Sequence, residues 1–125
     1  MFDKKTLDKS PLSLEEISRI EATNLSSLDR YHLRLLAHCL QCFKSMAGSD
    51  SGPLPDEQAR LKWCIEQPTL VHERPFISVL LEQFAVAGNQ LERLATDCET
   101  SPLALTLDDL IKSSISSKED YVEHY

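Results

Sequence analysis

The stretch that decides the fold runs from residue 28 to residue 47 and reads LDRYHLRLLAHCLQCFKSMA. Its apolar residues recur at spacings of three and four, which is the period of a helix that buries one side. On a helical wheel they cover an arc of about 200°, which is wider than one partner helix needs. The stretch therefore predicts a long helix that packs against at least two neighbours.

The rest of the chain predicts four further helices, each with residues nearby that are typical of a helix end. Ser13 followed three residues later by Glu16 is a capping-box pattern, and Gly48 suits the position just past the long helix. Pro55 and Thr106 each suit the start of a short helix. Two long helices are expected over residues 28–47 and 75–96. Three short helices are expected over residues 14–23, 55–67 and 106–115.

The expected fold class is all-α, a compact bundle of about five helices that forms a single domain over residues 12–115. Both long helices are expected to be broadly buried, because the second carries only a narrow polar stripe among its apolar residues. Residues 1–11 are polar and predict a flexible lead-in, and residues 116–125 predict a frayed acidic tail.

Composition and charge exclude several classes of partner. Apolar residues make up 42% of the chain and charged residues 26%, the ordinary mixture of a globular domain. The net charge is −7; residues 1–96 hold 11 Lys and Arg against 13 Asp and Glu, and residues 97–125 hold 2 against 7. With no basic stripe, neither nucleic acid nor an anionic membrane surface is an expected partner. The acidic end is either a solvated end or a segment that docks onto a basic partner.

The first two expected helices do not have the features of a helix-turn-helix DNA-binding element. The second helix is too apolar for a DNA groove, and the turn has no glycine. The first residues contain no apolar signal region, and no apolar run approaches the roughly 18 residues of a membrane span. The expected location is cytoplasmic, where the four cysteines would be reduced thiols.

The heptapeptide AHCLQCF, residues 37–43, is the stretch most suggestive of chemistry. Cys39 and Cys42 share the apolar side of the long helix, whereas His38 lies on its polar border. The pair lies far from a helix N-terminus, which a redox Cys-x-x-Cys favours, and no second close pair completes a zinc site with Cys64 or Cys98. Core packing is the preferred interpretation, and a metal or redox site is the alternative.

Two further residues are candidates for a functional role. His32 lies at the centre of the apolar arc and predicts a core histidine bonded to another helix, with a ligand role as the alternative. Trp63 is the only tryptophan and points away from Leu61 and Ile65, which share a side with Cys64. Either this short helix is sandwiched between neighbours, or Trp63 is an exposed anchor for a partner.

No sequence motif indicates catalysis or nucleotide binding. The chain contains no G-x-G-x-x-G, no P-loop, no H-E-x-x-H and no G-x-S-x-G. The favoured function is a non-enzymatic helical module for protein–protein interaction, regulation or assembly, whose partner is another protein or a second copy of itself. The alternative is a small-molecule, haem or metal binder with an interhelical cavity near His32, Cys39 and Cys42. No catalytic residue and no cofactor is expected.

Three stretches resemble a known group of proteins: HLRLLAHCLQCFKSMAG at 32–48, LPDEQARLKWCIEQP at 54–68 and SPLALTLDDLI at 101–111. They are similar to small hypothetical all-helical proteins encoded by cyanobacteria. That group has no assigned activity, so the resemblance implies a cytosolic setting in a photosynthetic cell and carries over no functional residue.

Overall fold

The chain is built from helices, as the sequence predicts. A computed structural model describes residues 12–67 and 74–123, and these ranges contain no strand. The all-α fold class is therefore confirmed. The elements, in chain order, are α2 Leu14–Glu21, α3 Ser27–Ala47, α4 Glu57–Glu66, α5 Arg74–Asp97, the 3-10 helix η1 Pro102–Ala104 and α6 Leu107–Glu123.

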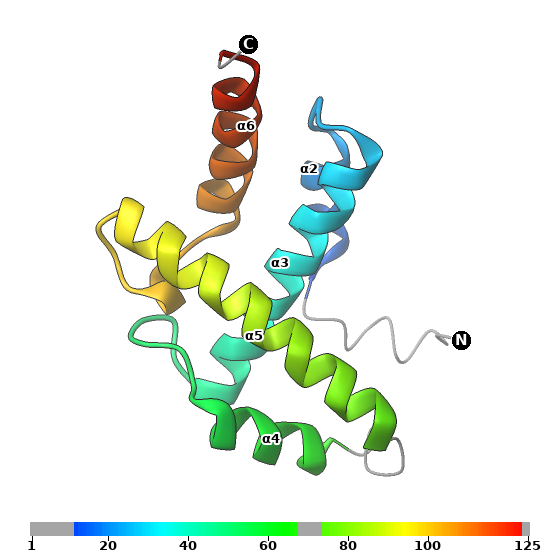
Figure 1. Ribbon diagram of the computed structural model, residues 1–125, viewed down its shortest axis with the longest axis vertical. Coiled ribbons are helices and arrows are strands. Elements are labelled where there is room, and N and C mark those ends of the chain that lie inside the picture. Colours follow the sequence, from blue (N-terminus) through cyan, green and yellow to red (C-terminus); the bar gives the residue numbers. More distant parts are fainter. Residues whose placement is uncertain (1–11, 68–73, 124–125) are drawn as a thin grey trace.

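Helix α3 is the centre of the molecule and packs against α2, α4, α5, α6 and η1. Figure 1 shows α5 crossing α3 near its middle, with α2 and α6 beside one end of α3 and α4 at the other end. Helix α4 also packs against α5, so that the two long helices share a third partner. The prediction that α3 has at least two neighbours is confirmed.

The helix ends lie where their capping residues predict. The Ser13 hydroxyl accepts a hydrogen bond from the Glu16 amide at 3.1 Å, and the Glu16 carboxylate accepts one from the Ser13 amide at 3.0 Å. Thr106 makes the equivalent reciprocal pair with Asp109 at the start of α6. Gly48 closes α3 with a φ of 63°, the left-handed conformation that a residue with a side chain adopts at a cost.

The core is a single apolar cluster to which all the helices contribute, and its aromatic rings lie where α3, α4 and α5 meet. The rings of Phe43 and Phe84 lie 5.3 Å apart between centroids, and Trp63 of α4 meets Phe84 edge-on at 6.1 Å. The Arg60 guanidinium lies 5.0 Å above the Phe43 ring, and its Nε donates to the Pro55 carbonyl at 2.9 Å. The largest fully buried side chains are Phe43, Phe84, Ile20, Leu33, Leu40, Leu91, Leu103, Leu105, Leu110, Cys39 and Cys64.

Two helix ends differ from expectation. Helix α6 continues to Glu123 rather than ending near residue 115. Helix α4 begins at Glu57, because Asp56 rather than Pro55 supplies the cap and accepts from the Ala59 amide at 2.8 Å. The expected lead-in over residues 1–11 lies outside the described residues. Of the residues the structure describes, none belongs to a helix both long and apolar enough to span a bilayer.

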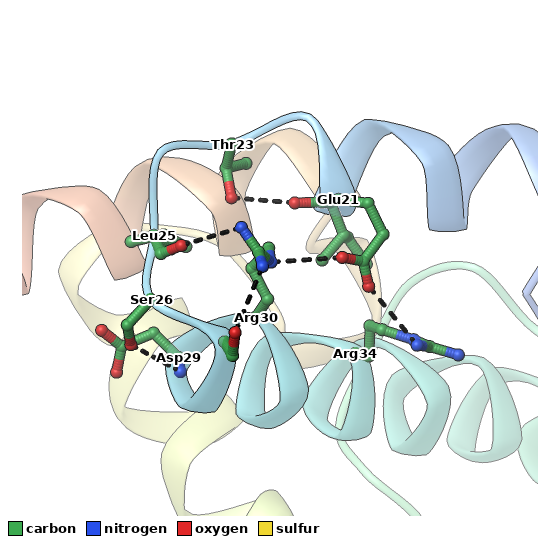
Figure 2. Close-up of polar contacts among 9 residues, drawn as sticks. Glu21, Thr23, Leu25, Ser26, Asp29, Arg30 and Arg34 are labelled. Carbon is green, nitrogen blue, oxygen red and sulfur yellow. Dashed lines mark hydrogen bonds and ion pairs between the residues drawn. The ribbon is translucent and has the colours of Figure 1, made fainter.

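The turn between α2 and α3 is held by one carboxylate (Figure 2). Glu21, in the last turn of α2, contacts Arg30 Nε at 3.1 Å and Arg34 Nη1 at 3.4 Å, both on α3. Arg30 also donates to the Leu25 carbonyl at 3.1 Å, which ties the connecting loop to the helix. Arg19 and Asp108 form an ion pair between α2 and α6. These contacts fix the position of α2 along α3.

Candidate functional site

The two long helices are not broadly buried as the sequence predicts, because each exposes a row of apolar side chains. On α5, Phe76, Val79 and Val86 are 51%, 50% and 60% exposed, and on α3 Leu28 and Tyr31 are 63% and 54% exposed. The α5 residues recur at helical spacing and form one stripe. An apolar stripe that faces water is the feature of this chain that requires a functional explanation.

One hollow lies where the first turns of α5 approach α2 and the middle of α3. It has a volume of about 520 Å³ and is open to solvent. Its walls are mainly apolar, and its polar lining consists of basic, amide and phenol side chains. The lining residues are Leu12, Ile17, Tyr31, Arg34, Leu35, His38, Cys39, Phe76, Leu80 and Gln83.

A second hollow of about 540 Å³ lies further along the same two helices. Leu35 and Gln83 line both hollows, so the two adjoin. We call these two adjoining hollows the α3–α5 groove. The second hollow is lined by His32, Leu35, Leu36, Val79, Glu82, Gln83, Val86, Ala87 and Gln90.

A third hollow, of about 690 Å³, continues from the groove toward α6 and has a different character. It shares His32, Leu36 and Gln90 with the second hollow. Asp29, Asp97 and Arg93 line it together with two serines of α6, so its surface is more polar than that of the other two hollows. The two hollows of the α3–α5 groove, in contrast, expose mainly apolar surface.

The exposed stripe exists because the partners of α5 lie on one side of it. Helix α5 packs against α3, α4 and η1, and these contacts bury Ile77, Phe84, Leu91 and Ala95. Val79 and Val86 lie away from that side of the helix and remain exposed. The wide apolar arc of the sequence therefore contains two surfaces, one that packs in the core and one that has no partner among the described residues.

The prediction that His32 is a core histidine is wrong. His32 is exposed, and its ring lies 5.9 Å from the ring of Tyr31 on the same helix. At His32 the apolar arc faces the open groove, whereas further along the helix Phe43 is buried against Phe84 of α5. His32 is thus a groove residue.

His38 differs from its prediction in the opposite sense. The sequence predicts that it points toward water, and the structure shows it half-buried. It lines the first hollow beside Arg34 and Phe76. Burial lowers the pKa of His38 below its ordinary value of 6.5, because the cation loses hydration there. The imidazole is therefore neutral at pH 7 and can both donate and accept hydrogen bonds in the groove.

Cys39 and Cys42 are buried, in agreement with the packing interpretation of AHCLQCF. Burial raises the pKa of Cys39 to about 11 and that of Cys42 to about 12. The nearby thiols of Cys39 and Cys64 raise the pKa of Cys42 further, so α3 and α4 bring three cysteines together. Cys98 is exposed and stands apart. Thiols held in the protonated form are poor nucleophiles and poor metal ligands.

The alternative ligand set of His32, Cys39 and Cys42 is not gathered in one hollow. His32 lines the second hollow, whereas Cys39 lies at the base of the first. Within residues 12–67 and 74–123, no group of three or more His, Cys, Asp and Glu side chains is placed to hold a metal ion.

The orientation of α4 also differs from expectation. Trp63 and Cys64 point inward, Trp63 half-buried against Phe84, whereas Leu61 and Ile65 are exposed. One indole fills more of the space beside Phe84 than an aliphatic side chain can, and its position sets the inward side of this short helix. Trp63 as an anchor for a partner stays a prediction.

Sequence reasoning singled out none of the α5 residues of the groove. Phe76, Val79 and Val86 recur at spacings of three and seven, which is also the spacing of a buried stripe. One signal in the sequence could have indicated them. The apolar arcs of both long helices are wider than the few expected neighbouring helices could cover. That excess indicates an exposed apolar surface.

Comparison with known proteins gives one family. The model of the family described as NDH complex assembly factor CRR9 matches residues 12–119, which is most of the chain. No curated protein and no solved structure matches the chain. The chain belongs to the CRR9 family of NDH complex assembly factors. The expected resemblance to a small helical family is confirmed in part: the family that matches has a named assembly role, and not merely an unknown activity. The cyanobacterial setting stays a prediction.

Proposed function

Given that membership, we propose that this chain assists the assembly of the NDH complex as a non-enzymatic binding protein, and that the α3–α5 groove is where it holds its client. The client is a subunit of the complex or a partly assembled form of it. The family description supplies the assembly role. The exposed apolar stripe supplies a means of carrying it out.

The observation that carries this proposal is the exposure of Phe76, Val79 and Val86 in one row above two adjoining hollows. Burial of apolar surface is the main favourable term in protein association, and about 25 cal/mol is gained per square ångström removed from water. Aromatic side chains at the centre of such a surface contribute most. Phe76 and Tyr31 supply such side chains in the first hollow of the groove.

The chemistry of the groove supports binding rather than catalysis. Its titratable side chains are spread along two helices, and the buried thiols beside it are protonated at pH 7. An assembly factor needs a surface that binds its client and then releases it, and an apolar groove with a few polar groups at its rim suits that task.

Co-purification tests the proposal. The full chain, tagged and expressed in cells that make the NDH complex, is compared with the double variant Val79→Asp/Val86→Asp. Because each carboxylate would have to be desolvated on binding, we expect recovery of NDH subunits to fall by about tenfold or more. The matched control is Leu61→Asp/Ile65→Asp on α4, whose side chains are similarly exposed at 42% and 51%.

The control variant is expected to recover NDH subunits at the level of the original chain. Equal recovery with the groove variant and the original chain would contradict the assignment of the groove. A tagged chain that captures a second copy of itself and no NDH subunit would contradict the client role. The cytoplasmic location is a further part of the proposal, and fractionation of the same cells tests it.

A further inference from the structure

The two ends of the α3–α5 groove differ in charge. Arg34 lines the first hollow beside the neutral His38, and no Asp or Glu is among the described residues that line it. The second hollow contains Glu82 and no Lys or Arg. The third hollow, beyond the groove, adds Asp29 and Asp97 to Arg93. Among the described residues that line the groove, the one positive side chain is therefore Arg34, at one end, and the one carboxylate is Glu82, in the second hollow.

The charge of Arg34 is only partly balanced within the chain. Its Nη1 lies 3.4 Å from Glu21, and the same carboxylate contacts Arg30 at the shorter distance of 3.1 Å (Figure 2). One carboxylate thus serves two guanidinium groups, which leaves a net positive charge at this corner. Arg34 is about half-exposed, so an incoming carboxylate can reach it. Guanidinium and carboxylate groups form paired hydrogen bonds of fixed geometry.

The shape of the groove suits a helix. Tyr31, Leu35 and His38 on one side recur at spacings of four and three, and Phe76, Val79 and Val86 on the other recur at spacings of three and seven. Each row spans roughly 10–15 Å at 1.5 Å per residue, which is two to three turns of a helix. Among the described residues there is no strand edge to which an extended peptide could add. An amphipathic helix with apolar residues at every third or fourth position matches these rows.

Resting on the proposed function above, we propose that the groove binds an amphipathic helix of an NDH complex subunit in one direction. The apolar stripe of that helix lies on Phe76, Val79 and Val86, and an acidic side chain at one end of the stripe pairs with Arg34. Charge complementarity of this kind selects among partners and sets the register of a docked helix. A helix with a basic residue at that end would face Arg34 with a like charge and is disfavoured.

Site-specific photo-crosslinking tests the direction. The photoreactive residue p-benzoylphenylalanine replaces Phe76 in one full-length chain and Val86 in another, and the cross-linked peptides from cells that make the NDH complex are identified by mass spectrometry. We expect both positions to attach to one helix of an NDH subunit, two to three turns apart. An Asp or Glu is expected within one turn of the site captured by position 76. Cross-links that show the helix bound in both directions, or cross-links to peptides without an acidic residue near position 76, would overturn the proposal.

Charge reversal separates this inference from the proposed function. Arg34→Glu is compared with Lys62→Glu, an exposed position on α4, in the co-purification described above. We expect Arg34→Glu to lower recovery of NDH subunits by about tenfold and Lys62→Glu to leave it unchanged. Should Arg34→Glu lower the melting temperature, Arg34→Gln removes the charge and keeps most of the side chain, and a severalfold loss is expected.

Failure of the directed-helix proposal and failure of the groove as the client site give different results. If Val79→Asp/Val86→Asp abolishes recovery and both Arg34 variants retain it, the directed helix is wrong and the groove remains the client site. If the Val79→Asp/Val86→Asp variant retains recovery, the groove itself is wrong. Capture of a second copy of this chain by positions 76 and 86 would show self-association in the groove and would also overturn the proposal.

Discussion

Leu35 of α3 and Gln83 of α5 line the same two hollows, although they are 48 residues apart in the sequence. Through these two residues, the hollow that contains Phe76 adjoins the hollow that contains Val86. Of the exposed apolar side chains of the long helices, Tyr31, Phe76, Val79 and Val86 therefore border one groove, whereas Leu28 lies outside it. This groove is the basis of the predictions that concern function, and the packing beneath it is the basis of those that concern stability.

Two phenylalanines on α5 are expected to respond differently to truncation. Phe84 is fully buried between Phe43 and Trp63, so Phe84→Ala should lower the free energy of unfolding by about 3–5 kcal/mol. Phe76 is 51% exposed in the groove, so Phe76→Ala should lower it by less than about 1 kcal/mol. Urea denaturation followed by circular dichroism measures both. Equal losses would contradict the assignment of one residue to the core and the other to the groove.

The four cysteines are expected to react with iodoacetamide in two classes. Cys98 is exposed and should be alkylated within minutes at pH 8 in the native protein. Cys39 and Cys42 are buried and remain protonated at that pH, so their alkylation should wait for unfolding. Mass spectrometry of native and urea-treated samples counts the labels. Cys98→Ser should abolish the fast class, and rapid native labelling of Cys42 would contradict the burial.

Stability should fall at alkaline pH because of the same thiols. Their folded pKa values, about 11 for Cys39 and 12 for Cys42, lie above the ordinary value of 9.0. Above pH 9 the unfolded chain loses thiol protons that the folded chain keeps, so the free energy of unfolding decreases until the folded thiols also ionise. The decrease is at most about 1.4 kcal/mol per pH unit for each thiol.

The measurement is urea denaturation at pH 8 and pH 10. Cys42→Ala should show a smaller decrease between these pH values than the original chain, and Cys98→Ser should show the same decrease. A Cys42→Ala variant with an unchanged pH dependence would contradict the raised pKa of Cys42.

Acid should destabilise the chain through His38. The pKa of His38 is lower in the folded chain than its ordinary value of 6.5, which applies to the unfolded chain. At a pH between the folded pKa and 6.5, His38 therefore binds a proton in the unfolded chain but not in the folded one. The contribution of neutral His38 to stability is thus present near pH 7 and is lost as the pH falls through this window. His38→Gln should lose less stability than the original chain between pH 7 and pH 5 in thermal denaturation. An identical loss in both would be evidence against burial of His38 in the groove.

The sequence predicts the helices and their ends because those features depend on neighbours in the chain. The capping pairs Ser13–Glu16 and Thr106–Asp109 join residues three positions apart, and Gly48 needs only its own φ. The burial of Cys39 and Cys42 follows in the same way from their spacing on one side of α3. Local chemistry therefore determines most of the secondary structure.

The groove could not be predicted in the same way because it depends on how many partners each helix meets. Periodicity gives the width of an apolar arc, and it does not say which part of the arc a neighbour covers. His32 and His38 differ from expectation for this reason, since α5 leaves the first in the open groove and encloses the second beside Phe76. Trp63 differs because its large ring, rather than the smaller Leu61 and Ile65, fills the space beside Phe84.

The most direct test of the groove as the client site is the amount of assembled NDH complex in living cells. Cells that carry Val79→Asp/Val86→Asp in place of the natural gene are compared with cells that carry Leu61→Asp/Ile65→Asp and with a deletion strain. Native gel electrophoresis with immunodetection measures the complex, and immunodetection of this chain confirms equal amounts of both variants. We expect the groove variant to match the deletion strain and the control variant to match the original. Normal levels of complex with the groove variant would contradict the claim.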